Sequence, residues 1–436
     1  MRIFAISILL GSLAIQVKGE DWPTYGHDNR RSHVTQESLS LPLSESWVYR
    51  SATPPQTAWT GPAKWDAFAG NEGLQSMRNF DPVFYVTAVG DQVAFGSSVD
   101  HAVHLVSATT GEEQWVAFTD GAVRLPPTWA DGRLYFGSDD GHAYCVDSES
   151  GREIWKYRPS DEQRLIPSNG KLMSTFPVRT GVLVDGATAY FGCSLFPWEP
   201  SFLCSLDVKT GEKYFVEKLS GVTLQGALLA SSERLYVPQG RSVPLVFAKS
   251  SGSQLGSVAG TGGVYCILTA EDQLIAMPKN QKSKDDVVTV TDPANRESVL
   301  SIVGTARMIA SGRNAYFHQL GQLKAIDRFV AAKANQKLSA LKKAKAPDEE
   351  IGKARNEGEA AQLWSSRQPI PSALVLAGRQ LYLGGDGQVF AVDSESGEKI
   401  WSAEVEGRAY GLAVANGRLF VSTDRGFIYG FSQASR

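Results

Sequence analysis

The chain has 436 residues, of which 42% are hydrophobic and 20% are charged, with a formal net charge of −3. This balance supports a buried core and excludes an intrinsically disordered chain. The small negative charge, spread without a basic stripe, excludes nucleic acid as an expected partner.

The first residues resemble a targeting signal. Arg2 provides a positive start, an apolar stretch runs from Ile3 to Ile15, and small residues follow near Gly19. The apolar stretch is too short to span a membrane comfortably. We predict a secretory signal at residues 1–19, with a periplasmic or secreted mature chain at 20–436 that has no integral membrane span. An uncleaved anchor is the alternative.

The two ends of the mature chain carry matching strand signals. Asp21 to Val34 is polar and rich in turn residues, and Ser46 to Arg50 then reads as a short strand with no partner nearby. Three strands without a fourth are expected at 411–415, 418–422 and 427–431. We therefore predict that the N-terminal strand completes the C-terminal sheet, which removes an exposed sheet edge.

A repeated phrase organises the chain between these ends. The phrase from Asp147 to Trp155 returns almost unchanged from Asp393 to Trp401, each time after an alternating apolar run. Its glycine suits a tight turn, because glycine adopts a positive φ without steric cost. Equivalent turn glycines are Gly111, Gly151, Gly211 and Gly397, and the structural tryptophans expected to bridge neighbouring repeats are Trp115, Trp155, Trp364 and Trp401.

The repeat length indicates the architecture. A period of about 40–45 residues with four short strands per repeat is typical of an all-β propeller. Seven blades are expected at about 83–117, 126–157, 176–216, 225–258, 262–303, 306–365 and 371–404. With the blade shared between the two ends, the total is eight; seven blades are the alternative.

Insertions into the repeat fall on the two faces of the predicted ring. Residues 51–82, 158–175 and 194–201 belong to loops of one face and are expected to form a lip there. Loops held on a rigid scaffold are favoured for binding. On the opposite face, 328–362 is predicted to be a helical hairpin inserted in the sixth blade, because Pro347 followed by acidic residues marks a helix start.

The residue before each innermost strand lines the mouth of the predicted funnel. These residues are Arg124, Arg179, Gln225, Arg307, Ser372 and Tyr410. Several arginines at one opening favour an anionic or carbonyl-bearing ligand, because guanidinium groups form paired hydrogen bonds with such groups. The alternative is that they tie neighbouring blades together. Trp198 and Glu199, in the 194–201 insertion, are further candidate ligand contacts.

Cysteine and histidine provide little catalytic signal. Cys193 and Cys204 would stand opposite each other in a hairpin that turns at Trp198 and Glu199, which would permit a disulfide. Aligning the blades by their Tyr-Phe-Gly runs instead separates them and leaves free thiols. The six histidines lack metal-ligand spacing, and no nucleophile motif occurs. We therefore expect no metal and no catalytic residue.

The Asp-x-x-Ser/Thr-Gly-x-x-x-Trp phrase resembles the docking motif of the pyrroloquinoline-quinone (PQQ) repeat propellers, the quinoprotein-dehydrogenase-like superfamily. The start from Asp21 to Asp28, with Arg31 and Ser32, resembles the N-terminus of those dehydrogenases. The resemblance implies an eight-bladed propeller in the periplasm or outside the cell. The dehydrogenases hold PQQ between a tryptophan and a vicinal Cys-Cys disulfide, beside a calcium site and an Asp base, and this chain has no adjacent cysteines.

Two functional hypotheses follow from this resemblance. The first is a monomeric, non-catalytic binding or scaffold module for a protein or a small anionic or carbonyl ligand, with no cofactor. The alternative is a PQQ-dependent alcohol or sugar dehydrogenase with a divergent site that holds PQQ and calcium. A third hypothesis, polysaccharide binding, rests on Trp59 and Trp65.

Overall fold

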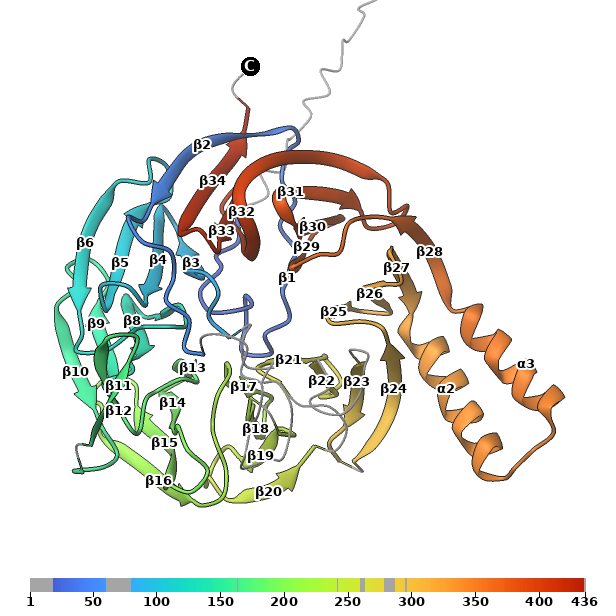
Figure 1. The fold of residues 1–436 in the computed structure, drawn as a ribbon, viewed down its shortest axis with the longest axis horizontal. Coiled ribbons are helices and arrows are strands. Elements are labelled where there is room, and N and C mark those ends of the chain that lie inside the picture. The colour runs from blue at the N-terminus through green and yellow to red at the C-terminus, as the bar shows by residue number, and fades with distance from the viewer. Residues whose placement is uncertain are drawn as a thin grey trace, which may run out of the picture.

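The computed structural model describes residues 19–59, 80–162, 164–240, 242–258, 263–277, 287–294 and 296–434. The predicted leader therefore lies outside the described residues apart from Gly19, and so do Trp65 and most of the first lip insertion. The described chain is mostly β-structure, in antiparallel sheets arranged around a central axis, with two helices at the rim (Figure 1). Among the described residues, no helix has the length and apolar character needed to cross a membrane.

Six of the sheets have four strands each, as expected for propeller blades. Their strands, in chain order, are β3 (Val86–Val89), β4 (Gln92–Ser97), β5 (Ala102–Ser107) and β6 (Glu113–Phe118); β7 (Thr128–Ala130), β8 (Arg133–Gly137), β9 (Ala143–Asp147) and β10 (Glu153–Tyr157); β13 (Leu183–Asp185), β14 (Thr188–Cys193), β15 (Ser201–Asp207) and β16 (Lys213–Leu219); β17 (Leu229–Ala230), β18 (Arg234–Val237), β19 (Leu245–Ala248) and β20 (Gln254–Ser257); β21 (Tyr265–Leu268), β22 (Leu274–Met277), β23 (Val287–Asp292) and β24 (Glu297–Val303); β25 (Met308–Ser311), β26 (Asn314–Gln319), β27 (Gln322–Asp327) and β28 (Gln362–Arg367).

The two ends of the described chain meet in an eight-stranded sheet. Its order is β1 (Val34–Thr35), β29 (Ala373–Ala377), β30 (Gln380–Gly384), β31 (Asp386–Asp393), β32 (Lys399–Ala415), β33 (Arg418–Thr423), β34 (Phe427–Gln433) and β2 (Leu43–Arg50). The 17-residue strand β32 pairs with β31 along its first part and with β33 along its last part. It therefore belongs to two four-stranded groups, β29 to β32 and β32 to β34 with β2, and β2 forms the outer strand of the second group by pairing with β34. The short strand β1 adds to the first group by parallel pairing with β29.

The repeated phrase forms a contact between neighbouring sheets. Trp115, on the outer strand β6, donates its indole N–H to the carbonyl oxygen of Ser148 in the turn of the next sheet, at 3.1 Å. Gly151 in that turn has a φ of +68°, and a Cβ there would come within 2.7 Å of the Trp115 ring. Glycine is thus required both by the backbone conformation and by the close approach of the ring.

The same indole contact recurs around the ring. The other pairs are Trp47 with Ala108, Trp155 with Val208, Trp364 with Ser394, and Trp401 with Leu43. Gly111, Gly211 and Gly397 lie against the rings of Trp47, Trp155 and Trp364, respectively. Trp47 was not among the tryptophans singled out from the sequence. Each contact fastens the outer strand of one blade to the next blade, which is a structural role. The partner lies in a turn in every case except that of Trp401, whose partner Leu43 begins the outer strand β2.

The helical hairpin occupies the connection between β27 and β28. It consists of α2 (Arg328–Lys343) and α3 (Asp348–Glu359), within the predicted insertion 328–362. Asp327 caps α2 by accepting hydrogen bonds from the backbone N–H groups of Phe329 and Val330. Asn335 of α2 donates to the carbonyl oxygen of Val299 on β24, a strand without a docking tryptophan. The hairpin thus connects two neighbouring blades where the repeated phrase is missing.

The polar N-terminal segment forms a belt along the inner strands, defined here as residues 20–35. Trp22 forms a bridge with Ala88, and further backbone hydrogen bonds join the belt to successive sheets around the axis (Figure 1). They are Trp129 N–H to Pro23, Ala230 to Asn29, Leu268 to Arg30, and Leu376 to His33. The belt crosses the end of the inner strands that leads into the second strand of each blade, opposite the lip.

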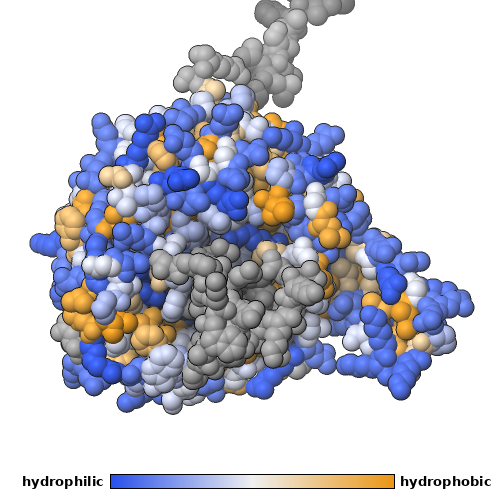
Figure 2. Space-filling model, viewed as in Figure 1, coloured by the Kyte–Doolittle hydropathy of each residue, from blue (hydrophilic) through white to orange (hydrophobic). Residues whose placement is uncertain are grey.

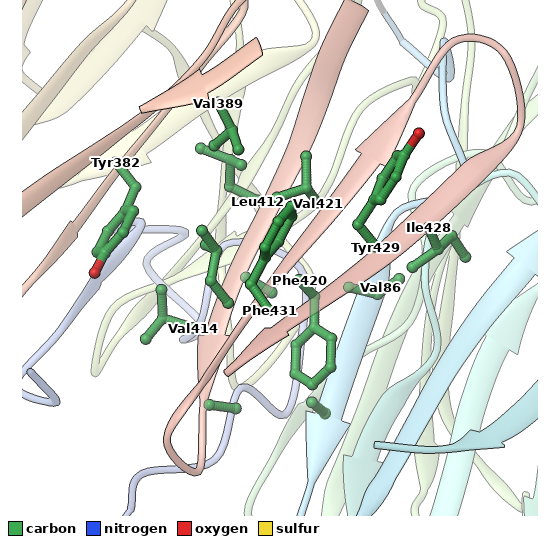
Figure 3. Close-up of a cluster of buried hydrophobic side chains, with 14 of the residues drawn as sticks. Val86, Tyr382, Val389, Leu412, Val414, Phe420, Val421, Ile428, Tyr429 and Phe431 are labelled. Carbon is green, nitrogen blue, oxygen red and sulfur yellow. The ribbon is translucent and has the colours of Figure 1, made fainter. Parts of the chain in front are cut away.

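The largest hydrophobic cluster lies where the two chain ends meet. Figure 3 shows side chains of β30–β34 and β3 in this cluster, including Tyr382, Leu412, Phe420 and Phe431. Phe420 and Tyr382 are at most 1% exposed. Burial of side chains of this size stabilises a fold by about 1.5–3 kcal/mol each. Ring closure therefore has the packing of an ordinary blade interface.

Candidate functional site

The lip face contains a small hairpin that projects beyond the blades. β11 (Leu165–Ser168) pairs with β12 (Lys171–Ser174) and belongs to no other sheet. Its tip reaches across the face, because the Asn169 side chain donates to the carbonyl oxygen of Thr57 and the Lys171 ammonium donates to that of Val99. The second predicted insertion therefore packs against described residues of the first.

Beneath this hairpin lies a buried cluster of two arginines and two aspartates. Arg124 donates from Nη1 to Asp81 at 2.5 Å and from Nε to Asp139 at 2.6 Å. Arg179 donates to both oxygens of Asp139, at 2.8 and 2.9 Å. All four residues are at most 6% exposed, so the two positive charges have two negative partners inside the protein.

The cluster also fixes the lip. Arg124 donates to the carbonyl oxygen of Gln56, and Asp81 accepts from the backbone N–H of Ala58. Burial raises the pKa of Asp139, but the charges of Arg124 and Arg179 outweigh burial and lower it to about 2. Burial raises the pKa of Asp81, which pairs with one arginine rather than two.

Two of the predicted ligand contacts are therefore engaged by carboxylates of the protein itself. Arg124 and Arg179 precede the inner strands as expected, but their hydrogen bonds are directed at Asp81 and Asp139. The sequence analysis missed Asp139. Its only local signal is its position directly after the Phe136-Gly137-Ser138 strand exit, at the same end of the blade as Arg124.

The other mouth residues lie apart from this cluster. Gln225 is 3% exposed, donates its backbone N–H to Pro238 and pairs with Gln239, while its side-chain Nε2 is buried without a hydrogen-bond partner. Arg307 and Tyr410 both line a pocket near the axis. The structure thus separates the predicted set into a carboxylate-paired group, a buried amide and an axial group.

The axial group surrounds a cavity of about 20 Å³ between the belt and the inner strands. Its polar lining is Tyr25, His33, Tyr85, Tyr265, Arg307 and Tyr410. The Arg307 guanidinium lies 4.8 Å from the centre of the Tyr265 ring, and the Tyr25 and Tyr85 rings meet edge to face at 5.1 Å. A cavity of this size holds about one or two water molecules.

Trp198 and Glu199 project on the lip face, as predicted for the third insertion. Trp198 is 63% exposed and stacks on Phe196, with ring centres 4.8 Å apart. Glu199 forms an ion pair with Arg164, which directly precedes β11. This pair joins the third insertion to the projecting hairpin. Leu165 and Leu172 of that hairpin are also exposed, at 46% and 57%.

The cysteine prediction needs a correction. Cys193 stands opposite Phe202 and Cys204 opposite Phe191, so the two cysteines are diagonal neighbours rather than a facing pair. The hairpin turns at Pro197 and Trp198, one residue earlier than the disulfide required, since the N–H of Glu199 donates to the Phe196 carbonyl. All four cysteines are buried free thiols, which corresponds to the alternative register.

Comparison with protein families identifies the repeats. A family model described as outer membrane protein assembly factor BamB matches residues 56–328 and 347–436, which is most of the chain. The chain belongs to this PQQ-like repeat family. The interruption of the match coincides with α2 and the hairpin turn, whereas α3 lies within the matched part. No curated protein matches the chain.

Two solved dehydrogenase structures share the fold at low sequence identity. A quinohemoprotein alcohol dehydrogenase from Pseudomonas putida HK5 is 11% identical, with a TM-score of 0.62 over 95% of this chain and 81% of that one. A europium-containing methanol dehydrogenase is 11% identical, with a TM-score of 0.60 over 94% and 98% of the two chains. BamB from Moraxella catarrhalis is 14% identical, with a TM-score of 0.37 over 79% and 82%.

The described residues do not fit the PQQ and calcium that the resemblance implies. The axial cavity has room for small groups of a few atoms, and the two arginines nearest the lip are already paired with carboxylates. The fused-ring cofactor would have to displace Tyr25, Tyr85 or Tyr265. Within the described ranges, no three His, Cys, Asp or Glu side chains converge in a way that could hold a metal ion.

Proposed function

We propose that this chain is an exported, monomeric, eight-bladed PQQ-like propeller that acts as a non-catalytic binding module for a protein partner. The partner binds the lip platform, defined as Leu165, Leu172, Phe196 and Trp198. The observation that carries the proposal is the exposed Phe196–Trp198 stack, joined to the leucine-bearing hairpin by the Arg164–Glu199 ion pair. The six separate four-stranded sheets and the two groups joined by β32 support a count of eight blades.

The platform has the composition of a protein-binding surface. Leu165 and Leu172 lie on the same side of the hairpin, because Leu165 faces Ser174 and Pro167 faces Leu172 across the two strands. Hydrophobic residues gather over this part of the lip face in Figure 2. Tryptophan and other large apolar side chains, surrounded by charged residues, are enriched where protein interfaces gain their binding energy. The assembly role named for the family model is consistent with a protein ligand.

Site-specific photocrosslinking in producing cells tests this proposal. A photoreactive phenylalanine analogue at position 198 is expected to give a discrete protein adduct that disappears when Leu165→Ser and Leu172→Ser are added. The matched control is position 214, where an exposed tyrosine lies near the start of outer strand β16, at the end of the blade opposite the lip. Equal adducts at the two positions, or an adduct insensitive to the leucine changes, would contradict a platform-specific partner.

The dehydrogenase alternative makes a different prediction. If PQQ binds with calcium, thermal melting of the purified chain should show a saturable rise in midpoint. A site occupied at 100 times its dissociation constant stabilises a protein by about 2.7 kcal/mol. We expect no saturable rise, and a rise accompanied by alcohol or sugar oxidation would replace the proposal.

A further inference from the structure

The axial pocket differs from the rest of the ring mouth in its charge. Arg124 and Arg179 have carboxylate partners, whereas no described carboxylate lies within ion-pair distance of Arg307. Its guanidinium group contacts Tyr265, with the ring centre 4.8 Å away. A ring face offsets only part of the loss of water around a half-buried guanidinium. The pocket therefore has an uncompensated positive charge.

The groups around Arg307 are neutral. Burial, together with the charge of Arg307, lowers the pKa of His33 to about 3, so its imidazole carries no charge near neutral pH. Burial raises the pKa of Tyr25, Tyr85 and Tyr265, so their hydroxyl groups stay protonated, and those of Tyr25 and Tyr85 hydrogen-bond each other. The pocket thus combines one cation with hydroxyl donors, and none of its lining residues is acidic.

One polar group in the pocket has no partner. His33 is 9% exposed, and its Nε2 is buried without a hydrogen bond. The belt holds this ring in place, because the His33 backbone N–H donates to Gly26 and the ring lies 5.2 Å from that of Tyr265. Buried polar atoms are nearly always hydrogen-bonded, and an orphan in a cavity indicates a missing ligand or water.

We propose that the axial pocket binds a small monovalent anion, no larger than formate, between Arg307 and His33. The cation and the hydroxyl donors supply the attraction, since hydrogen bonds to charged groups are the stronger ones. The cavity of about 20 Å³ sets the size limit. Chloride and formate both carry a single negative charge and accept hydrogen bonds. The site is separate from the lip platform, so either proposal can fail without the other.

The bound anion also connects the belt to the blades. His33 and Tyr25 belong to the belt, whereas Tyr265 and Arg307 precede or begin the inner strands β21 and β25. An anion between them bridges the N-terminal belt and the inner strands of two other blades, which are far apart along the chain. Anion binding is therefore expected to raise the stability of the whole ring.

Thermal melting and chloride NMR of the mature chain test the anion site. At constant ionic strength set with gluconate, added chloride or formate is expected to raise the melting midpoint saturably. The chain should also broaden the ³⁵Cl resonance, and formate should reverse the broadening if both anions share the site. Sulfate, which is larger and divalent, is expected to compete at least tenfold less well.

Substitutions test whether the midpoint rise and the line broadening arise in the axial pocket. Arg307→Gln is expected to abolish both the midpoint rise and the line broadening, and Tyr265→Phe, which keeps the ring, should weaken them. Arg50→Gln is the matched control, since Arg50 is exposed and also lies over an aromatic ring, that of Phe427. If neither anion broadens or stabilises the wild-type chain, or if Arg307→Gln retains the full effect, the proposal is wrong. The competition between chloride and formate for the wild-type chain tests the site even if a variant fails to fold.

Discussion

The arginines on the two sides of the ring mouth have different kinds of partner. Near the lip, Asp139 lies between Arg124 and Arg179, and Asp81 completes the buried set. Near the axis, Arg307 lies over Tyr265 with neutral groups around it. The position of an arginine at the funnel mouth therefore does not make it a ligand contact. An arginine paired with a carboxylate stabilises the scaffold, whereas one without such a partner can bind a ligand.

The largest expected loss of stability comes from removing the charge of Asp139, the carboxylate that Arg124 and Arg179 share. Asp139→Asn leaves two buried guanidinium groups without their shared carboxylate, and loss of one partner from a buried ion pair costs about 3–5 kcal/mol. Chemical denaturation should therefore show a loss of stability of this size. Asp147→Asn, which changes an exposed turn aspartate, is the control and should cost less than about 1 kcal/mol. Similar losses in the two variants would contradict a special role of the cluster.

Removal of an inter-blade contact should have the next largest effect. Trp155 is 8% exposed and fastens β10 to the following blade. Replacement of a buried tryptophan by alanine costs about 3–5 kcal/mol, and partial exposure places Trp155→Ala near the lower end. Trp198→Ala, on the exposed platform, should change the unfolding free energy by less than about 0.5 kcal/mol. A comparable cost at the two positions would mean that Trp198 is structural.

The stability difference between the wild type and Asp139→Asn should depend on pH in the acidic range. The pKa of Asp139 lies below its ordinary value of 3.8, at about 2 in the folded chain. A depressed carboxyl pKa contributes stability that is complete above about pH 4 and is lost as the pH falls through 2. The difference in unfolding free energy between wild type and Asp139→Asn should therefore shrink by about 2 kcal/mol over this window. A difference that stays constant from pH 5 to pH 2 would contradict the assignment.

The smallest effect is expected on the surface of the lip. Arg164→Gln breaks the ion pair with Glu199, and both side chains are partly open to solvent. Exposed pairs contribute about 0–1 kcal/mol, so the unfolding free energy should barely change. The photocrosslink at position 198 should nevertheless weaken, because the pair orients the two halves of the platform. An unchanged crosslink would show that the ion pair between the hairpin and Glu199 does not contribute to the binding surface.

Local sequence signals were sufficient for much of the fold. The turn glycines and the alternating apolar runs predicted the blade positions, and the strand signal at Ser46–Arg50 predicted the pairing that β2 forms with β34. The start of α3 at Asp348 follows the predicted proline and acidic residues. These features are encoded within a few neighbouring residues, where backbone preference and periodicity act.

Features that depend on distant partners were not predictable in the same way. The polar belt carries no strand periodicity, because its backbone groups pair partly with one another and partly with several different blades. The partner of Arg124 and Arg179, Asp139, lies 15 and 40 residues away from them along the chain. The cysteine register differed from the disulfide arrangement by a single residue at the turn, which is enough to move a pair out of bonding position.

The charge comparison can be tested directly by diffraction from crystals of the mature chain soaked in bromide. An anomalous peak is expected within hydrogen-bonding distance of Arg307 and His33, with none beside Arg124 or Arg179. A peak at the paired arginines, or none at Arg307, would contradict the claim that carboxylate pairing decides which arginines of the ring mouth remain free to bind.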